Sequence, residues 1–158
     1  MPGPFTGLRV GLVTARTMAD VLGIEVAGVC SLDILARQSS LTLPVAVATD
    51  ARRKEIYWAL YDGPAADGSR RRLEGPAVDK PAAVAHVLAG LPVIGRGARL
   101  YADELGLAVA DVPEYPSAEV LAFGVATGTL PVVAPEPLYL RRPDVTPAIG
   151  GPKSVLPR

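Results

Sequence analysis

Cysteine, histidine and aromatic residues are scarce in this 158-residue chain, which has one cysteine, one histidine and 5% aromatic residues. A single cysteine, Cys30, cannot form an internal disulfide, and it fits a reducing compartment such as the cytoplasm. A single histidine, His86, excludes a site built on two histidine ligands from this chain. We interpret His86 as structural and Cys30 as a small buried apolar residue, because no Gly-x-Ser-x-Gly motif accompanies them.

Net charge and long apolar runs are also lacking. Sixteen basic residues balance sixteen acidic residues, so no global field attracts nucleic acid or an anionic membrane. The apolar runs are shorter than the roughly 20 residues that cross a bilayer. The first residues carry neither a charged nor an apolar region of a secretion signal. We therefore expect a cytoplasmic protein with no membrane association.

Hydrophobic residues, by contrast, make up 49% of the chain, and 16 glycines and 16 prolines are spread among them. This composition predicts a folded core built from short elements with tight loops. The length fits one domain, or one domain with part of another.

The first 44 residues predict an α-β-α order. Thr6 is placed to cap a helix over residues 7–22, and Gly23 is placed to end it. A β-branched run at 24–29 predicts a strand, and Ser31 is expected to cap a helix that extends to about residue 37.

The pattern changes after residue 44. Two strand-like runs, 45–50 and 55–62, flank a charged turn, and a third strand is expected at 70–73. The remaining predicted elements are a helix at 81–89, a strand at 92–95, a helix at 100–105, a strand at 107–112 and a helix capped by Ser117 that extends to 127.

Residues 45–128 therefore predict the order βββαβαβα. Each half of the actin-like (RNase-H-like) ATPase fold has this order, so we expect an α/β protein with that fold. The predicted organisation is a remnant of the first half at 1–44, a complete second half at 45–135, and a proline-rich tail at 136–158 that cannot be continuous helix.

The helix predicted at 7–22 is apolar around almost its whole circumference. At about 100° per residue, Arg9, Arg16 and Asp20 fall in one narrow polar stripe. A helix with so little polar surface should be buried on two sides. We expect one side to pack on its own sheet, and the other to be covered by a further part of the protein or by another subunit. Small residues at four-residue spacing, which allow close approach of a neighbour, are Gly7, Gly11, Ala15 and Ala19.

Carboxylates and basic clusters give weaker signals. Asp50 ends the first strand of the predicted half, where an acidic residue of an actin-like protein lies near nucleotide phosphate, but the following turn lacks the usual glycine. Charged turns are commonly only solvated, and no aromatic residues that could stack on bases are interleaved with the basic clusters. Clusters that could contact phosphates are Arg52-Arg53-Lys54, Arg70-Arg71-Arg72 and Arg141-Arg142.

Several blocks of the sequence are similar to one family. Residues 2–11, Pro-Gly-Pro-Phe-Thr-Gly-Leu-Arg-Val-Gly, closely resemble the glycine-rich signature of the TsaB family. Further blocks in family order are 23–24, 28–32, 50–57 and 137–143. The resemblance implies an actin-like fold and a cytoplasmic role in forming threonylcarbamoyladenosine beside the anticodon of tRNA.

The same resemblance implies a non-catalytic scaffold subunit. Its partners would be a related catalytic subunit, TsaD, a small ATPase, tRNA through the complex, and a second copy of itself. ATP and a metal are then expected in the partner subunits, and none in this chain. The resemblance places the partner interface on the first helix, at Phe5, Thr6, Leu8, Arg9, Leu12, Ala15, Arg16 and Ala19. An auxiliary tRNA contact is a further hypothesis for Arg52, Arg53, Arg70, Arg71 and Arg72.

The chain departs from the family at its beginning, because about 65 residues precede the glycine signature in family members. We expect a shortened chain whose first helix lacks most of its sheet and leaves a large apolar area exposed. Two other functions remain open: an actin-like ATPase or kinase, for which Asp50 is a weak nucleotide-site candidate, and a glycoprotease-type peptidase.

Overall fold

The strand Val45–Asp50 (β1) is the centre of the fold, because both of its faces are covered. Its first four residues are completely buried, and a strand buried on both faces reads as a continuous apolar run. The computed structural model describes residues 5–107 and 113–141, with side chains from residue 9 onward.

Four strands form one mixed sheet in the order β3-β2-β1-β4. The strand Ile56–Tyr61 (β2) pairs antiparallel with β1, Val45 opposite Tyr61. On its outer side it pairs antiparallel with Arg72–Asp79 (β3), and Val93–Ile94 (β4) runs parallel to β1. The order β1-β2-β3-α3-β4 agrees with the first five predicted elements of this half.

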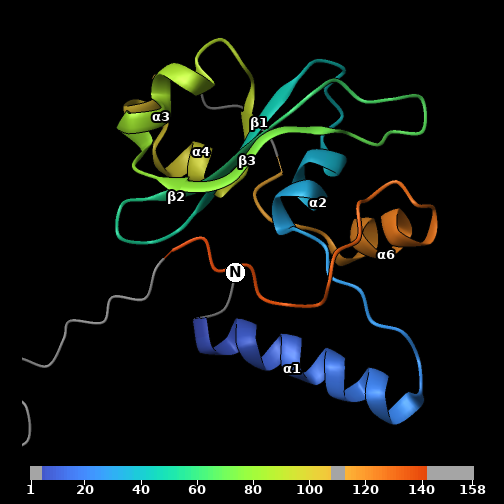
Figure 1. The fold of residues 1–158 in the computed structure, drawn as a ribbon. Helices are drawn as coiled ribbons and strands as arrows, with labels where there is room; N and C mark the ends of the chain where they lie inside the picture. The colour runs from blue at the N-terminus through green and yellow to red at the C-terminus, as the bar shows by residue number, and fades with distance from the viewer. Residues whose placement is uncertain (1–4, 108–112, 142–158) are drawn as a thin grey trace, which may run out of the picture.

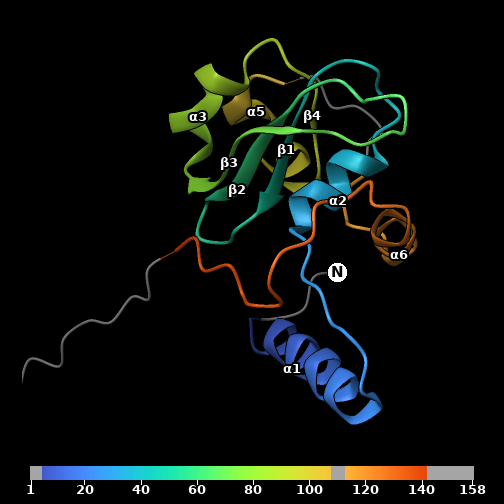
Figure 2. The same ribbon diagram turned by 45° about the vertical axis from the view of Figure 1, so that its right-hand side comes forward.

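The alternation of side chains along β1 builds a core on each face of the sheet. On one face, Ala46 and Ala48 pack with three helices: Pro81–Leu88 (α3), Arg96–Leu100 (α4) and Ala102–Leu105 (α5). Figures 1 and 2 show these helices on one side of the sheet and Ser31–Gln38 (α2) on the other.

On the other face, Val45 and Val47 pack with Leu32, Leu35 and Ala36 of α2. From the sequence, α2 was expected to belong to the remnant of the first half, yet it shares a core with β1 and β2. The helix Ala118–Ala126 (α6) contacts α2, and the Ser117 hydroxyl accepts a hydrogen bond from the Val120 amide at 3.4 Å, as the predicted cap should.

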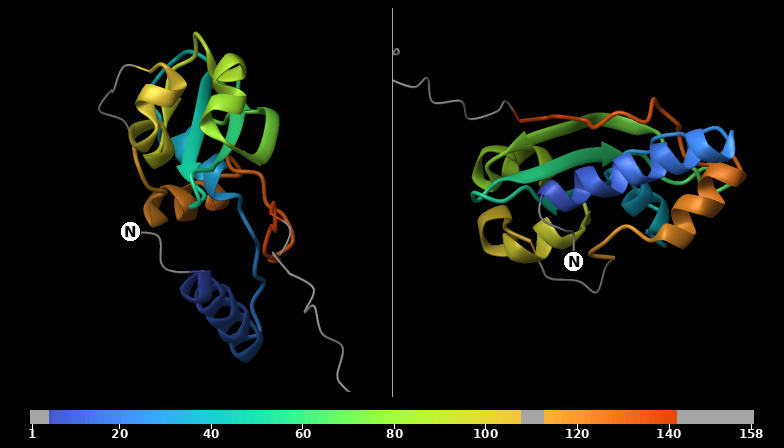
Figure 3. Two further views of the ribbon diagram at one scale, coloured as in Figure 1. Left: turned by 90° about the vertical axis from the view of Figure 1, so that its left-hand side faces the viewer. Right: turned by 90° about the horizontal axis from the view of Figure 1, so that it is seen from below.

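The helix Phe5–Leu22 (α1) lies apart from these layers (Figure 3). It makes no extensive contact with any other described helix or strand. Gly23 ends it in the left-handed region, with a φ of 65°, as the sequence predicted. No described strand makes an extensive contact with α1, and much of its apolar surface is exposed, in agreement with the large exposed apolar area expected for the first helix.

Several predicted boundaries are corrected by the structure. Residues 24–29 form no strand, because only Gly28 finds a partner, in one isolated bridge to Val133. Ser31 is the first residue of α2, and Cys30 occupies the cap position without a side-chain hydrogen bond. The third strand is Arg72–Asp79 instead of 70–73. The helix expected at 100–105 is divided at Tyr101. The strand expected at 107–112 lies almost entirely outside the described residues.

Candidate interaction surface

The surface of α1 is apolar and exposed, which is unusual for an 18-residue helix in a folded chain. Val10, Val13, Met18, Val21 and Leu22 are each between 57% and 80% exposed. These side chains extend over about half of the helix circumference. Exposed apolar areas of this kind commonly mark a surface that binds another protein.

One side of α1 is different, because it carries the polar stripe and faces the segment 131–141, which we call the C-terminal strap. The Arg9 guanidinium donates to the Tyr139 hydroxyl at 2.7 and 3.1 Å and lies 5.4 Å from the centre of its ring. Arg16 forms an ion pair with Glu136 at 3.0 Å. Ala19 is 4% exposed. The strap thus occupies the side of α1 that contains its basic residues.

The opposite side of α1 is largely exposed. Val10, Met18, Val21 and Leu22 lie away from the Arg9–Arg16 stripe on a wheel of about 100° per residue, and we call these four residues the apolar arc. Each member is more than half exposed. The geometry therefore separates α1 into a strap-facing polar side and an outward apolar side.

The structure distributes the predicted interface residues over both sides. Arg9 and Arg16 contact the strap, and Ala19 is buried. Leu12, at 40% exposure, is the least exposed of the large apolar side chains described on α1, and Ala15 is exposed. The side chains of Phe5, Thr6 and Leu8 lie outside the described part of the chain. The predicted interface residues do not include the four members of the apolar arc, although the same helical wheel contains them.

A second apolar surface lies on α6. Phe123 is 59% exposed and Val125 is 38% exposed. A shallow groove between α6 and the segment after α1 is lined by Glu25, Ala27, Ala118, Leu121, Ala122, Val125 and Ala126. Gly124 is the buried contact of α6, since a Cβ there would lie 2.5 Å from a side-chain atom of Leu130.

The predicted basic clusters differ in how much of their charge is accessible. Arg52, Arg53 and Lys54 form the exposed turn between β1 and β2, and all three have a positive φ near 60°. The Asp50 carboxylate accepts from the Arg52 amide at 2.8 Å, so it caps this turn. The nucleotide role suggested for Asp50 stays a prediction.

Within the second cluster, alternate side chains point to different surroundings. Arg71 is exposed and pairs with Asp62 at 3.1 Å. Arg70 is 9% exposed and donates to the backbone carbonyls of Leu41, Leu43 and Asp62. Burial lowers the pKa of the Arg70 guanidinium. Of Arg70 and Arg71, only Arg71 is therefore accessible to a binding partner.

Arg72 belongs to a buried polar network that the sequence did not indicate. Its guanidinium donates to both carboxylate oxygens of Asp33, at 3.0 and 2.6 Å, and the Tyr61 hydroxyl donates to the same carboxylate at 2.6 Å. Burial raises the pKa of Tyr61 strongly, and its hydrogen bond to Asp33 raises it further. This network holds α2 on β2 and β3. The tRNA contact predicted for the basic clusters stays untested, with Arg52, Arg53 and Arg71 as its exposed candidates.

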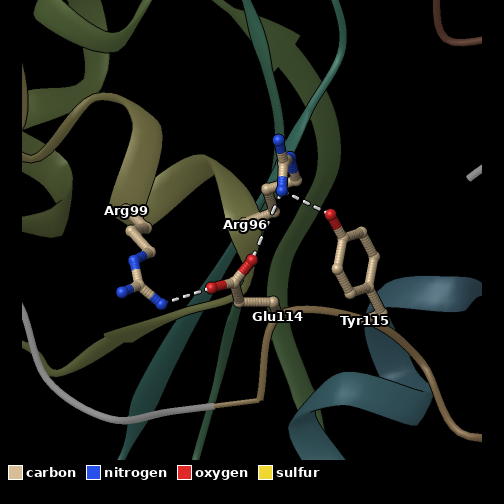
Figure 4. A network of polar contacts seen from close by, with 4 residues as sticks. All are labelled: Arg96, Arg99, Glu114 and Tyr115. Carbon is tan, nitrogen blue, oxygen red and sulfur yellow. Dashed lines mark hydrogen bonds and ion pairs between the residues drawn. The ribbon is translucent and has the colours of Figure 1, made fainter. Parts of the chain in front are cut away.

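A second polar network fixes the segment before α6 (Figure 4). Arg99 pairs with Glu114 at 2.6 Å, and Arg96 contacts both Glu114 and the Tyr115 hydroxyl. On the other side, the side-chain amide of Gln38 donates to the Tyr115 carbonyl at 3.2 Å. The network therefore links α4, α2 and the start of α6.

The single histidine and the single cysteine lie in different parts of the fold. His86 is exposed on α3, and Cys30 is partly buried next to α2, where burial raises its thiol pKa. In the described ranges, 5–107 and 113–141, no group of three or more histidine, cysteine or acidic residues could hold a metal ion. None of the helices described is long and apolar enough to span a membrane.

A family model described as "TsaD: tRNA N6-adenosine threonylcarbamoyltransferase" matches residues 1–131, most of the chain and nearly all of the described elements. The chain belongs to this family, whose fold is mixed α/β.

Within the family, the chain is TsaB-like. It is 33% identical over 157 residues to the "tRNA threonylcarbamoyladenosine biosynthesis protein TsaB" of Escherichia coli, covering 89% of this chain and 67% of that protein. The Bacillus subtilis TsaB is 39% identical over 64 residues, covering 38% of this chain and 27% of that protein.

An uncharacterised protein of Mycobacterium tuberculosis is 44% identical over 149 residues, covering 92% of this chain and 63% of the relative. The chain thus spans under two thirds of the length of that relative.

Solved structures agree with this placement. A Pseudomonas aeruginosa protein described as uncharacterised "with similarity to peptidase YEAZ" matches with a TM-score of 0.66 and 30% identity, over 89% of this chain and 70% of that one. YeaZ from the same organism matches with a TM-score of 0.61 and 28% identity, over 82% of this chain and 66% of that one.

Proposed function

We propose that this chain is a non-catalytic TsaB-type subunit in the formation of threonylcarbamoyladenosine in tRNA, and that it binds a TsaD-type catalytic subunit through α1. The observation that carries the proposal is the exposed apolar arc of α1. The names of the Escherichia coli and Bacillus subtilis relatives supply the pathway, and the family model supplies the type of enzyme.

The physical reason is the cost of leaving the arc in water. Each of the four large apolar side chains is more than half exposed. Covering their surface with a partner stabilises the complex by about 25 cal/mol for each Å² of apolar area buried. A partner helix packed along α1 would cover them together, since they lie along one side of the same helix. The proposed complex also contains a small ATPase and reaches tRNA; Arg52, Arg53 and Arg71 are the proposed auxiliary contacts.

A binding experiment with matched variants tests this proposal. The purified chain is titrated with the TsaD-type subunit of the same organism, and the affinity is measured by calorimetry. We expect Val21→Glu to weaken binding about tenfold or more, because it places a charge in the covered surface. Leu73→Glu, a control at an apolar residue of β3 that is 52% exposed, should leave the affinity unchanged.

Equal affinity of the two variants would show that α1 is not part of the interface. A failure of the unmodified chain to bind would overturn the proposal. Sedimentation of the chain alone, over a range of concentrations, separates binding to the catalytic subunit from binding to a second copy. Addition of the chain to the TsaD-type subunit and the small ATPase should increase modified tRNA, which nucleoside analysis measures.

A further inference from the structure

We propose that the C-terminal strap sets the rotation of α1 about its own axis, holding the polar stripe inward and the apolar arc outward. The orientation is a property of this chain alone. Its consequence for partner binding rests on the proposed function.

Two polar contacts join the strap to the same side of α1. Arg9 reaches Tyr139 at 2.7 Å, and Arg16 reaches Glu136 at 3.0 Å. These two arginines are seven residues apart, which is two helical turns, so they lie almost in line along the helix. Two contacts aligned along the helix determine which side of α1 faces the strap.

The strap can position α1 because the strap itself is fixed at two places. Near its start, Val133 and Gly28 exchange two backbone hydrogen bonds, both 2.8 Å long. At its described end, Arg141 pairs with Glu55, the residue before β2. The approach at Gly28 is close: a Cβ there would lie 2.6 Å from the Ala134 carbonyl oxygen. Glu136 and Tyr139 lie between these two fixed points.

Among the described residues, α1 has no extensive contact with another helix or strand. A rotation by half a turn would bring Met18 and Val21 against the strap. It would separate both arginines from their partners and leave the Glu136 carboxylate facing apolar side chains. The strap therefore selects one rotation through two polar contacts, although each exposed pair alone is weak.

This orientation revises the composition of the proposed interface. Arg9, Arg16 and Ala19 become intramolecular contacts, and the apolar arc becomes the surface that a partner covers. The strap is thus a positioning element for the interface.

Cross-linking within the full-length chain tests the orientation without a partner. In a Cys30→Ala background, one double variant carries Arg16→Cys with Glu136→Cys, and the control carries Met18→Cys with Glu136→Cys. Both retain the Arg9–Tyr139 contact. With a short thiol-to-thiol cross-linker such as dibromobimane, we expect the first pair to react about tenfold faster than the second, because proximity raises its effective concentration. Equal rates would overturn the proposal.

Hydrogen exchange of the otherwise unmodified chain gives a second measurement. Glu136→Gln with Tyr139→Phe removes the charge of one contact and the acceptor hydroxyl of the other. We expect amides of residues 9–22 to exchange about two- to fivefold faster, because releasing α1 favours its local opening. Glu74→Gln, an exposed control on β3, should leave them unchanged. Unaltered exchange in the strap variant would contradict the proposal.

The two hypotheses fail separately. If the cross-linking preference is present and the TsaD-type subunit does not bind, the strap proposal survives and the proposed function is wrong. If the subunit binds and the cross-linking rates are equal, the proposed function survives and the strap proposal is wrong.

Discussion

Asp33 is a carboxylate in an unusual position for this chain, since it is only 5% exposed and lies on the buried side of α2. Its charge is compensated by Arg72 and its oxygen atoms accept from Arg72 and Tyr61. Buried charges persist when they are paired and hydrogen-bonded in this way. The three side chains come from α2, β2 and β3, so they join two strands to a helix.

Removing the carboxylate should therefore be costly. Asp33→Ala leaves the Arg72 charge and the Tyr61 hydroxyl without their partner, and we expect it to lower the free energy of unfolding by about 3–5 kcal/mol. Urea denaturation followed by circular dichroism measures this change. Asp103→Ala, at an exposed residue of α5, should change stability by no more than about 0.5 kcal/mol. A loss under about 1 kcal/mol at Asp33 would contradict a structural role for the network.

The Tyr61 hydroxyl should make stability depend on alkaline pH. Burial raises its pKa in the folded chain above the ordinary value, which is about 10. The unfolded chain then releases this proton at lower pH than the folded chain. The associated stability is complete below about pH 10 and is lost as the pH rises above that value.

Urea midpoints at several pH values between 8 and 11.5 measure the effect. We expect the unmodified chain to lose stability more steeply above pH 10 than Tyr61→Phe, which starts from a lower stability because it lacks the hydrogen bond to Asp33. Tyr57→Phe, a control on the same strand, should keep the steep loss. If the stability of the Tyr61 variant and of the unmodified chain falls equally steeply with pH, a group other than Tyr61 causes the loss of stability above pH 10.

At the scale of elements, β3 shows how one residue fixes the register of a strand. Gly75 has a φ of 84°, and a Cβ there would lie 2.7 Å from the Trp58 carbonyl oxygen. The pairing of β2 with β3 shifts register between Trp58 and Leu60. A glycine at such an irregularity allows two backbones to approach and the strand to bend.

Gly75→Ala should consequently destabilise the chain by about 2–3 kcal/mol, combining an unfavourable φ with a steric clash. Gly90→Ala is the matched control, because Gly90 also has a positive φ, 78°, but has open space around it; we expect about 1 kcal/mol there. Thermal and urea unfolding measure both. An equal loss of unfolding free energy at the two sites would show that the close approach of Gly75 to Trp58 does not affect stability.

Regular elements were predictable where the local pattern and the tertiary contacts agree. The bounds of β1 and the extents of α1, α3 and α6 follow from apolar periodicity, from Gly23 and from the Ser117 cap. The strand predicted at 24–29 failed because a strand needs a neighbour: the Ile24 amide bonds back to Ala19 in α1, and only Gly28 pairs.

The candidate surface was predictable only in part. The polar stripe of α1 is visible in the sequence, as is its apolar remainder. The partners of the stripe are 120 and 130 residues away in the chain, and no local pattern predicts such contacts. For the same reason, the basic run 70–72 reads as one charged patch, although Arg70 and Arg72 make buried or partly buried contacts.

At the scale of the whole molecule, the described chain has two unlike parts. One is a sheet with helices on both faces and well-buried cores. The other is α1, joined to the rest by the segment after Gly23 and by the strap (Figure 3). The first part buries its own hydrophobic cores. The second presents exposed apolar surface, and this contrast is the basis of the proposed scaffold role.

Hydrogen exchange of the chain with and without the TsaD-type subunit tests the proposed interface on the unmodified protein, because it maps the covered surface. We expect saturating amounts of the subunit to slow exchange in residues 9–22, with little change at the β1–β2 turn, 51–55. If exchange in α1 stays unchanged while another region becomes protected, the partner binds elsewhere and α1 is not the interface.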